Sequence, residues 1–163
     1  MRKSYRPIYF SLIGLIFLII SWFSVEGYQV LSSIPEVNAV ILKDTCIRPY
    51  DGYSYRTGEI LLAYIDGELV TVPKGFITDL ASIPRWYWSI ISPARSDLIL
   101  GAIVHDYLYS CHHEMTRKNA DAILYNLLIA NGVDEYTAKK FYLAVRVFGS
   151  SHYGSERFCT SLK

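Results

Sequence analysis

Residues 98–109 read Leu-Ile-Leu-Gly-Ala-Ile-Val-His-Asp-Tyr-Leu-Tyr, and this stretch decides the fold. Before His105 the residues are apolar on nearly every helical face, which is typical of a helix buried inside a domain. We expect this helix to run from about Arg95 to Cys111. His105 and Asp106 then lie at the edge of a core, where a carboxylate is costly unless it is paired or binds a cation.

Two further helices are predicted downstream of this central helix. Thr116 is a typical cap for a helix from Arg117 to about Ala130, because its hydroxyl can accept a free backbone N–H. Asp134 caps the last helix, which runs to about Phe148 and is closed by a glycine. The second half of the chain is therefore helical.

The first half carries strand signals instead. In residues 60–72, two apolar runs flank Asp66-Gly67, which is typical of a tight hairpin turn. Asn38 to Thr45 predicts another strand, and a short apolar helix is predicted from Ser82 to Pro93. Together these segments predict an α+β fold: a small antiparallel sheet followed by a three- to four-helix bundle, with one N-terminal transmembrane helix.

An uncharged apolar run over residues 8–25 follows three basic residues at the N-terminus. Its length of about 18 residues is enough to cross a hydrocarbon core of about 30 Å. The positive flank should stay in the cytoplasm, which predicts a single-pass inner-membrane protein with its domain in the periplasm or otherwise outside the cytoplasm. We expect a membrane anchor (or a signal peptide) over 1–27, a linker over 28–37 and a globular domain over 38–163.

Charge and cysteine content narrow the class of protein. The net charge of +1 predicts no strong attraction to nucleic acid, so we expect no nucleic-acid partner. Cys46, Cys111 and Cys159 match no zinc-binding spacing. Outside the cytoplasm one disulfide and one free thiol are expected, and a Cys46–Cys159 pair would tie the ends of the domain together. Three reduced cysteines packed as small hydrophobic residues are the alternative.

Polar side chains on the two central helices form the candidate site. His105 lies on the first helix, and Asp121 lies among apolar residues on the second. Because only a short loop joins these helices, they should pack antiparallel and bring Asp121 toward His105. A carboxylate that orients an imidazole makes it a general base for water, and the adjacent Asp106 can hold a cation. Asp79 is a third candidate carboxylate.

A polar network that only fastens the helices is the alternative interpretation of the same residues. Buried His–Asp pairs often satisfy each other without any catalytic role. In that case we expect Arg117 and Asp121, which are four residues apart on one helix face, to form an ion pair.

Four blocks of sequence, in order along the chain, resemble a known family. They read TDLASIPR over 78–85, HDYLY over 105–109, RKNAD over 117–121 and YLAVRVFG over 142–149. From Gly75 to Gly149 the chain resembles a phage and bacterial family called domain of unknown function 1353. The resemblance implies a phage, prophage or bacterial origin, and it supplies no activity. Leu80 stands where we expect a small residue, often glycine.

The pattern His-Asp-x-x-Tyr on one helix and Arg-x-x-x-Asp on the next is similar to secretory phospholipase A2, especially its compact bacterial form. This resemblance implies that His105 is the general base, that Tyr109 and Asp121 hold it, and that Asp106 binds calcium. Calcium would polarise the ester carbonyl. The disulfide framework of that family is absent, and residues 74–79 are the sole candidate for its calcium loop.

These observations predict a membrane-anchored hydrolase of the cell envelope, with calcium as cofactor, membrane lipids as partners and phospholipid as substrate. One alternative is a metal-dependent peptidoglycan hydrolase, with zinc held by His105, by Asp106 or Asp79, and by His112 or His113. Another is a non-catalytic phage membrane protein, such as a lysis accessory or a superinfection-exclusion module. The hydrolase requires hydrogen-bond contact between His105 and Asp121, in a pocket that solvent and a ligand can enter.

Overall fold

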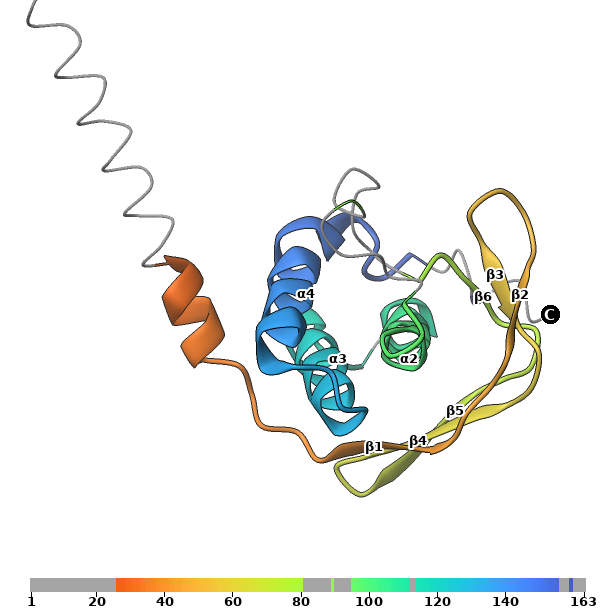
Figure 1. Ribbon diagram of the computed structural model, residues 1–163, viewed down its shortest axis with the longest axis horizontal. Helices are drawn as coiled ribbons and strands as arrows, with labels where there is room; N and C mark the ends of the chain where they lie inside the picture. The colour runs from red at the N-terminus through yellow and green to blue at the C-terminus, as the bar shows by residue number, and fades with distance from the viewer. Residues whose placement is uncertain (1–25, 81–88, 90–94, 112–113, 156–158, 160–163) are drawn as a thin grey trace, which may run out of the picture. The chain divides into compact units, whose positions relative to one another are not determined.

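A computed structural model describes residues 26–80, 89, 95–111, 114–155 and 159 of the chain (Figure 1). The predicted membrane segment over 8–25 and the predicted short helix over 82–93, apart from residue 89, lie outside these described residues. In the described part of the chain, no helix has the length and apolar content needed to cross a membrane.

Residues 1–34 and 35–163 form two separate compact units. In the first unit, residues 26–32 are helical, and the hydroxyls of Ser32 and Ser33 donate to the carbonyls of Gln29 and Val30. We expected a linker over 28–37. The part without regular secondary structure is shorter, because helical backbone continues to residue 32 and residues 34–38 alone are irregular.

The second unit begins with an antiparallel sheet whose strand order is β1-β4-β5. Its strands are β1 (Ala39–Lys43), β4 (Leu61–Ile65) and β5 (Glu68–Val72). Asp66 and Gly67, at the turn between β4 and β5, both have positive φ, at 46° and 95°. Glycine adopts this geometry freely, and aspartate tolerates it, so the predicted hairpin is confirmed.

A second antiparallel sheet, in the order β2-β3-β6, was not predicted. Its strands are β2 (Ile47–Pro49), β3 (Tyr55–Thr57) and β6 (Ile77–Thr78). The fold therefore has two small sheets where we expected one. The second sheet matters for the site because its last strand ends on a buried threonine, Thr78.

Three helices follow in the described residues, and they confirm the α+β class: α2 (Ile99–Cys111), α3 (Arg117–Ala130) and α4 (Glu135–Phe148). Thr116 and Asp134 accept backbone N–H bonds from Asn119 and Thr137, so both predicted caps are confirmed. The central helix begins at Ile99 and not at Arg95, because residues 95–98 form a turn.

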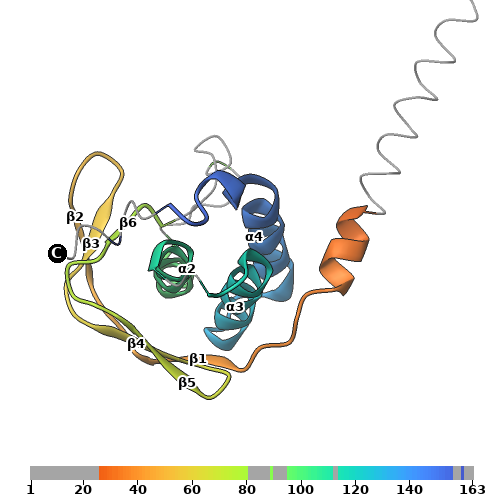
Figure 2. The same ribbon diagram turned by 180° about the vertical axis from the view of Figure 1, so that it is seen from behind.

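The core lies between the first sheet and the helices (Figures 1 and 2). One apolar cluster joins the inner face of β1, β4 and β5 to α2 and α3, and a second fills the space between α3 and α4. Helix α2 thus lies against the sheet on one side and against α3 on the other. Any polar group on α2 that faces α3 is taken out of water by this arrangement.

The cysteine pairing differs from the one we expected. Cys111, at the end of α2, forms a disulfide with Cys159, and Cys46 is a free, exposed thiol. A Cys46–Cys159 pair is therefore wrong. Cys46 lies between β1 and β2 beside Gly58, whereas the C-terminal segment returns to the end of α2.

Candidate functional site

His105 and Asp121 meet in the packed interface between α2 and α3. His105 Nε2 lies 2.8 Å from Asp121 Oδ1. Tyr109, one helical turn after His105, donates its hydroxyl to the same carboxylate oxygen at 2.5 Å, and its ring centroid lies 4.0 Å from that of His105. The predicted convergence of these three side chains is thus present, because the antiparallel packing of α2 and α3 sets them face to face.

The other oxygen of Asp121 binds an arginine that the sequence did not indicate. Arg146 Nη1 on α4 donates to Asp121 Oδ2 at 2.7 Å. Arg117, the expected partner, instead donates to the backbone oxygens of Arg146 and Val145 at the end of α4, at 3.0 and 3.4 Å. The carbonyls of a last helical turn have no intrahelical partner and carry partial negative charge, so they attract a guanidinium. The expected Arg117–Asp121 ion pair is wrong.

Asp106 connects this network to the second sheet. Thr78 Oγ1 at the end of β6 donates to Asp106 Oδ2 at 2.5 Å, and the same hydroxyl accepts the backbone N–H of Leu80 at 3.0 Å. Asp106 Oδ1 lies 3.8 Å from His105 Nδ1. The imidazole therefore has a carboxylate on each side, one from its own helix and one from α3.

The two carboxylates control the protonation of His105. Burial by itself would lower the pKa of His105, but hydrogen bonding to Asp106 and Asp121 and their negative charges raise it above the ordinary 6.5. Burial by itself would raise the pKa of Asp121, but hydrogen bonds from His105, Tyr109 and Arg146 and the charge on His105 lower it. Burial and the neighbouring Asp121 raise the pKa of Tyr109, so this hydroxyl stays protonated and acts as a donor.

The network is closed to solvent in this structure. His105, Asp106, Tyr109 and Asp121 are each 2% exposed or less. The segment after α4 covers Tyr109: Gly154 N donates to the Tyr109 carbonyl at 3.0 Å, and the Tyr153 ring packs edge-on against the Tyr109 ring. A Cβ at Gly149 would lie 3.0 Å from the Tyr109 hydroxyl, so a side chain at this position would require the tyrosine to shift slightly. We expected a pocket around His105 that is open to solvent. These contacts close that space instead.

The metal ligands that we expected are only partly placed. Asp106 is buried in the network, and Asp79 is half-buried directly after Thr78. Among the residues that the structure describes, no three His, Cys, Asp or Glu side chains gather into a metal-binding group. His112 and His113 lie outside the described residues.

The sequence places this network within a known family. Residues 59–145, which are more than half of the chain, match the family described as "Protein of unknown function (DUF1353)". The chain belongs to this family.

Curated relatives of this DUF1353 protein come from Sinorhizobium fredii (strain NBRC 101917 / NGR234). "Uncharacterized protein y4jT" is 35% identical over 79 residues, which cover 48% of this chain and 23% of that protein. "Uncharacterized protein y4iH" is 34% identical over 73 residues, which cover 44% of this chain and 30% of that protein. The matched part is therefore less than a third of either relative. No solved structure matches the chain, and none of these matches supports the resemblance to phospholipase A2.

The DUF1353 match encloses nearly all of the network. His105, Asp106, Tyr109 and Asp121 lie inside residues 59–145, as does Thr78, and Arg146 follows directly. Thr78 and Arg146 both stand in blocks that carried the family resemblance, but nothing in their spacing indicated a role. The position of Arg146 could have indicated its role. It follows Tyr142 by four residues, which places it on the face of α4 that is otherwise buried.

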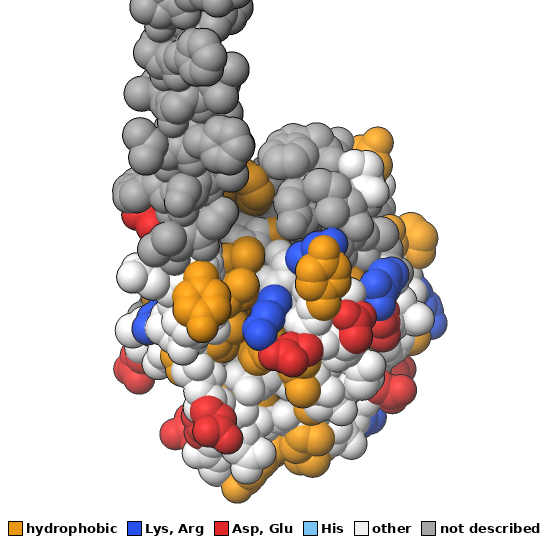
Figure 3. Space-filling model, turned by 60° about the vertical axis from the view of Figure 1, so that its left-hand side comes forward, with side chains coloured by type: hydrophobic (Ala, Val, Ile, Leu, Met, Phe, Trp, Pro, Cys, Tyr) orange, Lys and Arg blue, Asp and Glu red, His pale blue; other side chains and the backbone are white. Residues whose placement is uncertain are grey.

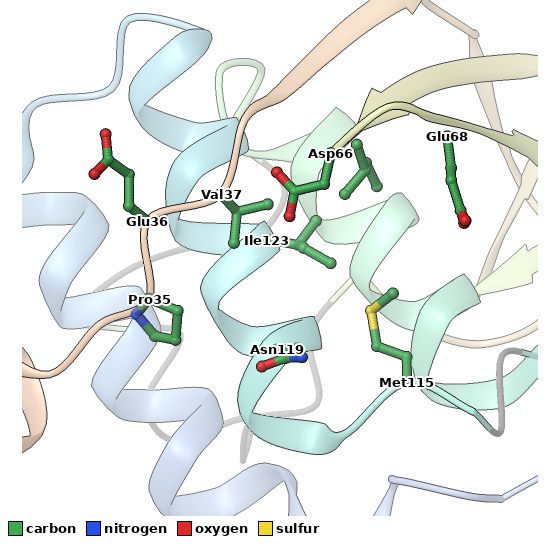
Figure 4. Close-up of a pocket in the computed structure, with 9 residues that line it drawn as sticks. Pro35, Glu36, Val37, Asp66, Glu68, Met115, Asn119 and Ile123 are labelled. Atoms are coloured by element: carbon green, nitrogen blue, oxygen red, sulfur yellow. The ribbon is translucent and has the colours of Figure 1, made fainter.

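A separate pocket of about 360 Å³ lies beside the start of α3 and does not include the His105 network (Figure 4). Its rim carries Glu36, Asp66 and Glu68, and apolar side chains such as Val37 and Ile123 form its wall. One oxygen of Asp66 already accepts the backbone N–H of Asn38 at 2.9 Å. On the face shown in Figure 3, acidic, basic and apolar side chains intermix, with no single-sign field that would select a partner.

Replacing Thr78 with valine tests how much the second sheet supports the site. The change keeps the side-chain volume but removes the donor to Asp106 and the acceptor for Leu80. We expect the free energy of unfolding to fall by about 2–3 kcal/mol, since buried polar groups lose their partners. Urea unfolding measures it. Thr71→Val on the exposed face of β5 is the matched control and should change by less than about 0.5 kcal/mol. Equal losses in both variants would contradict the buried role of Thr78.

Proposed function

We propose that this DUF1353 protein is a membrane-anchored hydrolase of the cell envelope, of phage, prophage or bacterial origin, in which His105 is the general base for water. The observation that carries the proposal is the 2.8 Å contact between His105 Nε2 and Asp121 Oδ1, completed by the Tyr109 hydroxyl on the same oxygen. A carboxylate held by its own donors is a fixed acceptor. It therefore sets both the orientation of the ring and the tautomer.

The tautomer decides which ring nitrogen does the chemistry. When Nε2–H donates to Asp121, the neutral imidazole keeps its lone pair on Nδ1, which faces Asp106. Nδ1 lies 3.8 Å from Asp106 Oδ1, which leaves no room for a water between them, so in this proposal the attacking water reaches Nδ1 only when the site opens. His105 takes one proton from this water, and the hydroxide adds to the ester carbonyl of the substrate. The tetrahedral intermediate then breaks its bond to the alkoxy oxygen, and the imidazolium gives its proton to that leaving alkoxide. Asp121 stabilises the imidazolium during the step.

Access to His105 requires a movement, because the described side chains close the network. The contacts of Tyr153 and Gly154 on Tyr109 lie on a segment after the last long helix. The Tyr153 hydroxyl also donates to the Met115 carbonyl at 2.5 Å, so displacement of this segment must break that bond as well. Substrate entry by displacement of this cover belongs to the proposal, and closure around the substrate would exclude water during the reaction.

Phospholipid is the substrate that we propose. As a membrane anchor, the apolar run over 8–25 would hold the domain at a high effective concentration over lipid. Calcium is the proposed cofactor, with Asp106 and Asp79 as ligands. Because Asp106 Oδ2 is engaged by Thr78, no step above is routed through a metal ion.

The experiment is a hydrolysis assay on the full chain reconstituted in phosphatidylethanolamine–phosphatidylglycerol vesicles, with released fatty acid measured by mass spectrometry. We expect release to rise with pH through a pKa above 6.5, because His105 must be neutral to accept a proton and its neighbours raise its pKa. A rate that falls over this range, or no fatty acid at any pH, would overturn the lipid proposal.

The same assay distinguishes calcium from zinc as the cofactor and phospholipid from peptidoglycan as the substrate. Full activity with excess chelator would remove calcium from the proposal, and activity restored by zinc but not by calcium would favour the zinc alternative. Purified peptidoglycan is the second substrate arm, and soluble fragments without fatty-acid release would favour the peptidoglycan hydrolase.

A non-catalytic role is the second candidate, and the burial of the network favours it. A fully satisfied buried polar network can serve only to fix how helices pack. In that case the full chain would release no product in either arm, and substitutions in the network would change stability alone. Substitutions at His105 and Asp121 therefore distinguish the two candidates.

A further inference from the structure

The outer face of the first sheet is apolar, although it is exposed. Along β1, β4 and β5 the side chains alternate between a buried inner face and an outer face. The inner set forms part of the core. Helices α2 and α3 lie on that inner side, and the other side of the sheet faces outward in both views (Figures 1 and 2).

Most of the outer positions are apolar. They are Val40, Leu42 and Lys43 on β1, Leu62 and Tyr64 on β4, and Leu69 and Thr71 on β5; Lys43 is included because it pairs with Leu62 after a bulge in β1. Leu42 and Leu69 are 59% and 58% exposed, and Val40 and Tyr64 are 40% and 38% exposed. An antiparallel sheet with one solvated face normally carries polar residues there. This face departs from that rule at five of its seven positions.

The apolar side chains form one continuous surface. Val40 pairs directly with Tyr64, and Tyr64 pairs directly with Leu69, so one unbroken row crosses all three strands. Isolated exposed apolar residues are ordinary, whereas these three side chains are direct neighbours across the sheet. Lys43 pairs with Leu62 in the neighbouring row of the same face, and Glu68 pairs with the inward-facing Ile65, so the row from Val40 to Leu69 itself carries no charge.

We propose that this outer face of β1-β4-β5 docks on the surface of a lipid bilayer; the inference rests on the proposed membrane anchoring. Residues 26–38 alone separate the apolar run from β1, so the sheet is the first element of the domain that the chain reaches. Aliphatic side chains around a central tyrosine suit the interface, where an apolar body enters lipid and a hydroxyl stays wet.

A second copy of the chain fits this face less well. Three strands about 4.8 Å apart, each rising about 3.3 Å per residue over five residues, give a face on the order of 250 Å². A stable protein interface needs about 800 Å² on each partner. A tethered domain, in contrast, needs only a small gain from lipid contact, because the tether has already removed most of the entropy of approach.

The test uses the full chain with one fluorescent label. Cys46→Ser removes the free thiol, and the disulfide protects the other two cysteines. Leu69→Cys then places an environment-sensitive dye on the outer face, and Asp51→Cys places it on an exposed turn as the matched control. Each protein is reconstituted in nanodiscs that hold one chain, with and without lipids that carry a quencher at headgroup depth.

We expect the dye at position 69 to emit further to the blue than at position 51 and to be quenched at least about twofold more strongly by the labelled lipids. Equal, water-like emission at the two positions overturns the docking. A blue shift that appears only in vesicles with many chains, and not in single-chain nanodiscs, also overturns it and assigns the face to a second copy. This readout needs no hydrolysis, so it succeeds or fails independently of the catalytic proposal.

Discussion

Replacing His105 with glutamine is expected to lower fatty-acid release by about 10²- to 10⁴-fold, which is the usual contribution of a general base. Glutamine is the sharpest substitution here because its amide can still donate to Asp121 Oδ1 as His105 Nε2 does. It cannot accept a proton from water at neutral pH. The measurement is the initial rate of release by the reconstituted full chain, taken above the pKa of His105.

Lys118→Gln is the control for this substitution. Lys118 is exposed on α3, outside the network and the cover, so glutamine there should leave the rate unaltered. The residual stability of the His105 variant is measured in parallel by urea unfolding. A folded His105→Gln protein that keeps the wild-type rate would remove His105 from the proposed mechanism.

The local elements that were predictable have signals contained within a few residues. The Asp66-Gly67 hairpin, the Thr116 cap and the Asp134 cap all depend on the chemistry of single side chains beside the backbone that they satisfy. The meeting of His105 with Asp121 was also predictable. A short connection forces two helices into antiparallel contact, and both residues stand among apolar neighbours.

The second sheet was not predictable, because its strands are too short to show a period. Strand β6 consists of Ile77 and Thr78 alone, and β2 ends on Pro49. Its pairing depends on contacts between distant segments, such as the Thr57 hydroxyl bonding to the Pro73 carbonyl and the Phe76 N–H. Local propensity contains no information about such pairs. The role of Thr78 was not predictable for the same reason, because its partner Asp106 is 28 residues away in the sequence.

Leu80 shows how a departure from the family pattern can be explained only by structure. It has φ of +64° and is fully buried. The backbone at this position favours glycine, as the resemblance implied, whereas the core around it rewards a large apolar side chain. The burial of the leucine side chain therefore offsets the strain of a positive φ at this position.

The choice of Arg146 over Arg117 could not be derived from helical spacing. Arg117 and Asp121 are correctly spaced to meet on one helix, but spacing along α3 does not show which groups α4 brings to the buried carboxylate. Two polar groups at the contact between α3 and α4 need partners. The buried Asp121 carboxylate needs a cation, and the carbonyls at the end of α4 need hydrogen-bond donors. Arg146 on α4 binds the carboxylate on α3, and Arg117 on α3 donates to a carbonyl on α4.

Asp121→Asn is expected to produce the largest loss of stability, about 3–5 kcal/mol near pH 5.5, because it leaves a buried charge without its partner. The asparagine amide keeps the volume of the carboxylate but cannot balance the charges of both His105 and the partly exposed Arg146. Urea unfolding followed by circular dichroism measures the change. Asp97→Asn removes the partner of Arg95 in an exposed ion pair and is the matched control, with a loss below about 1 kcal/mol.

The dependence of this loss on pH identifies its cause. Since the pKa of His105 is raised in the folded protein, its contribution is complete below 6.5 and disappears as the pH rises through the raised pKa. Since the pKa of Asp121 is lowered, its contribution is present above 3.8 and disappears as the pH falls below that value. The difference between wild type and Asp121→Asn should therefore be largest between these two limits and shrink on either side. A loss that is the same at every pH would mean that Asp121 acts through packing and not through the charge on the imidazole, and the general base would then have no ionic partner to hold it.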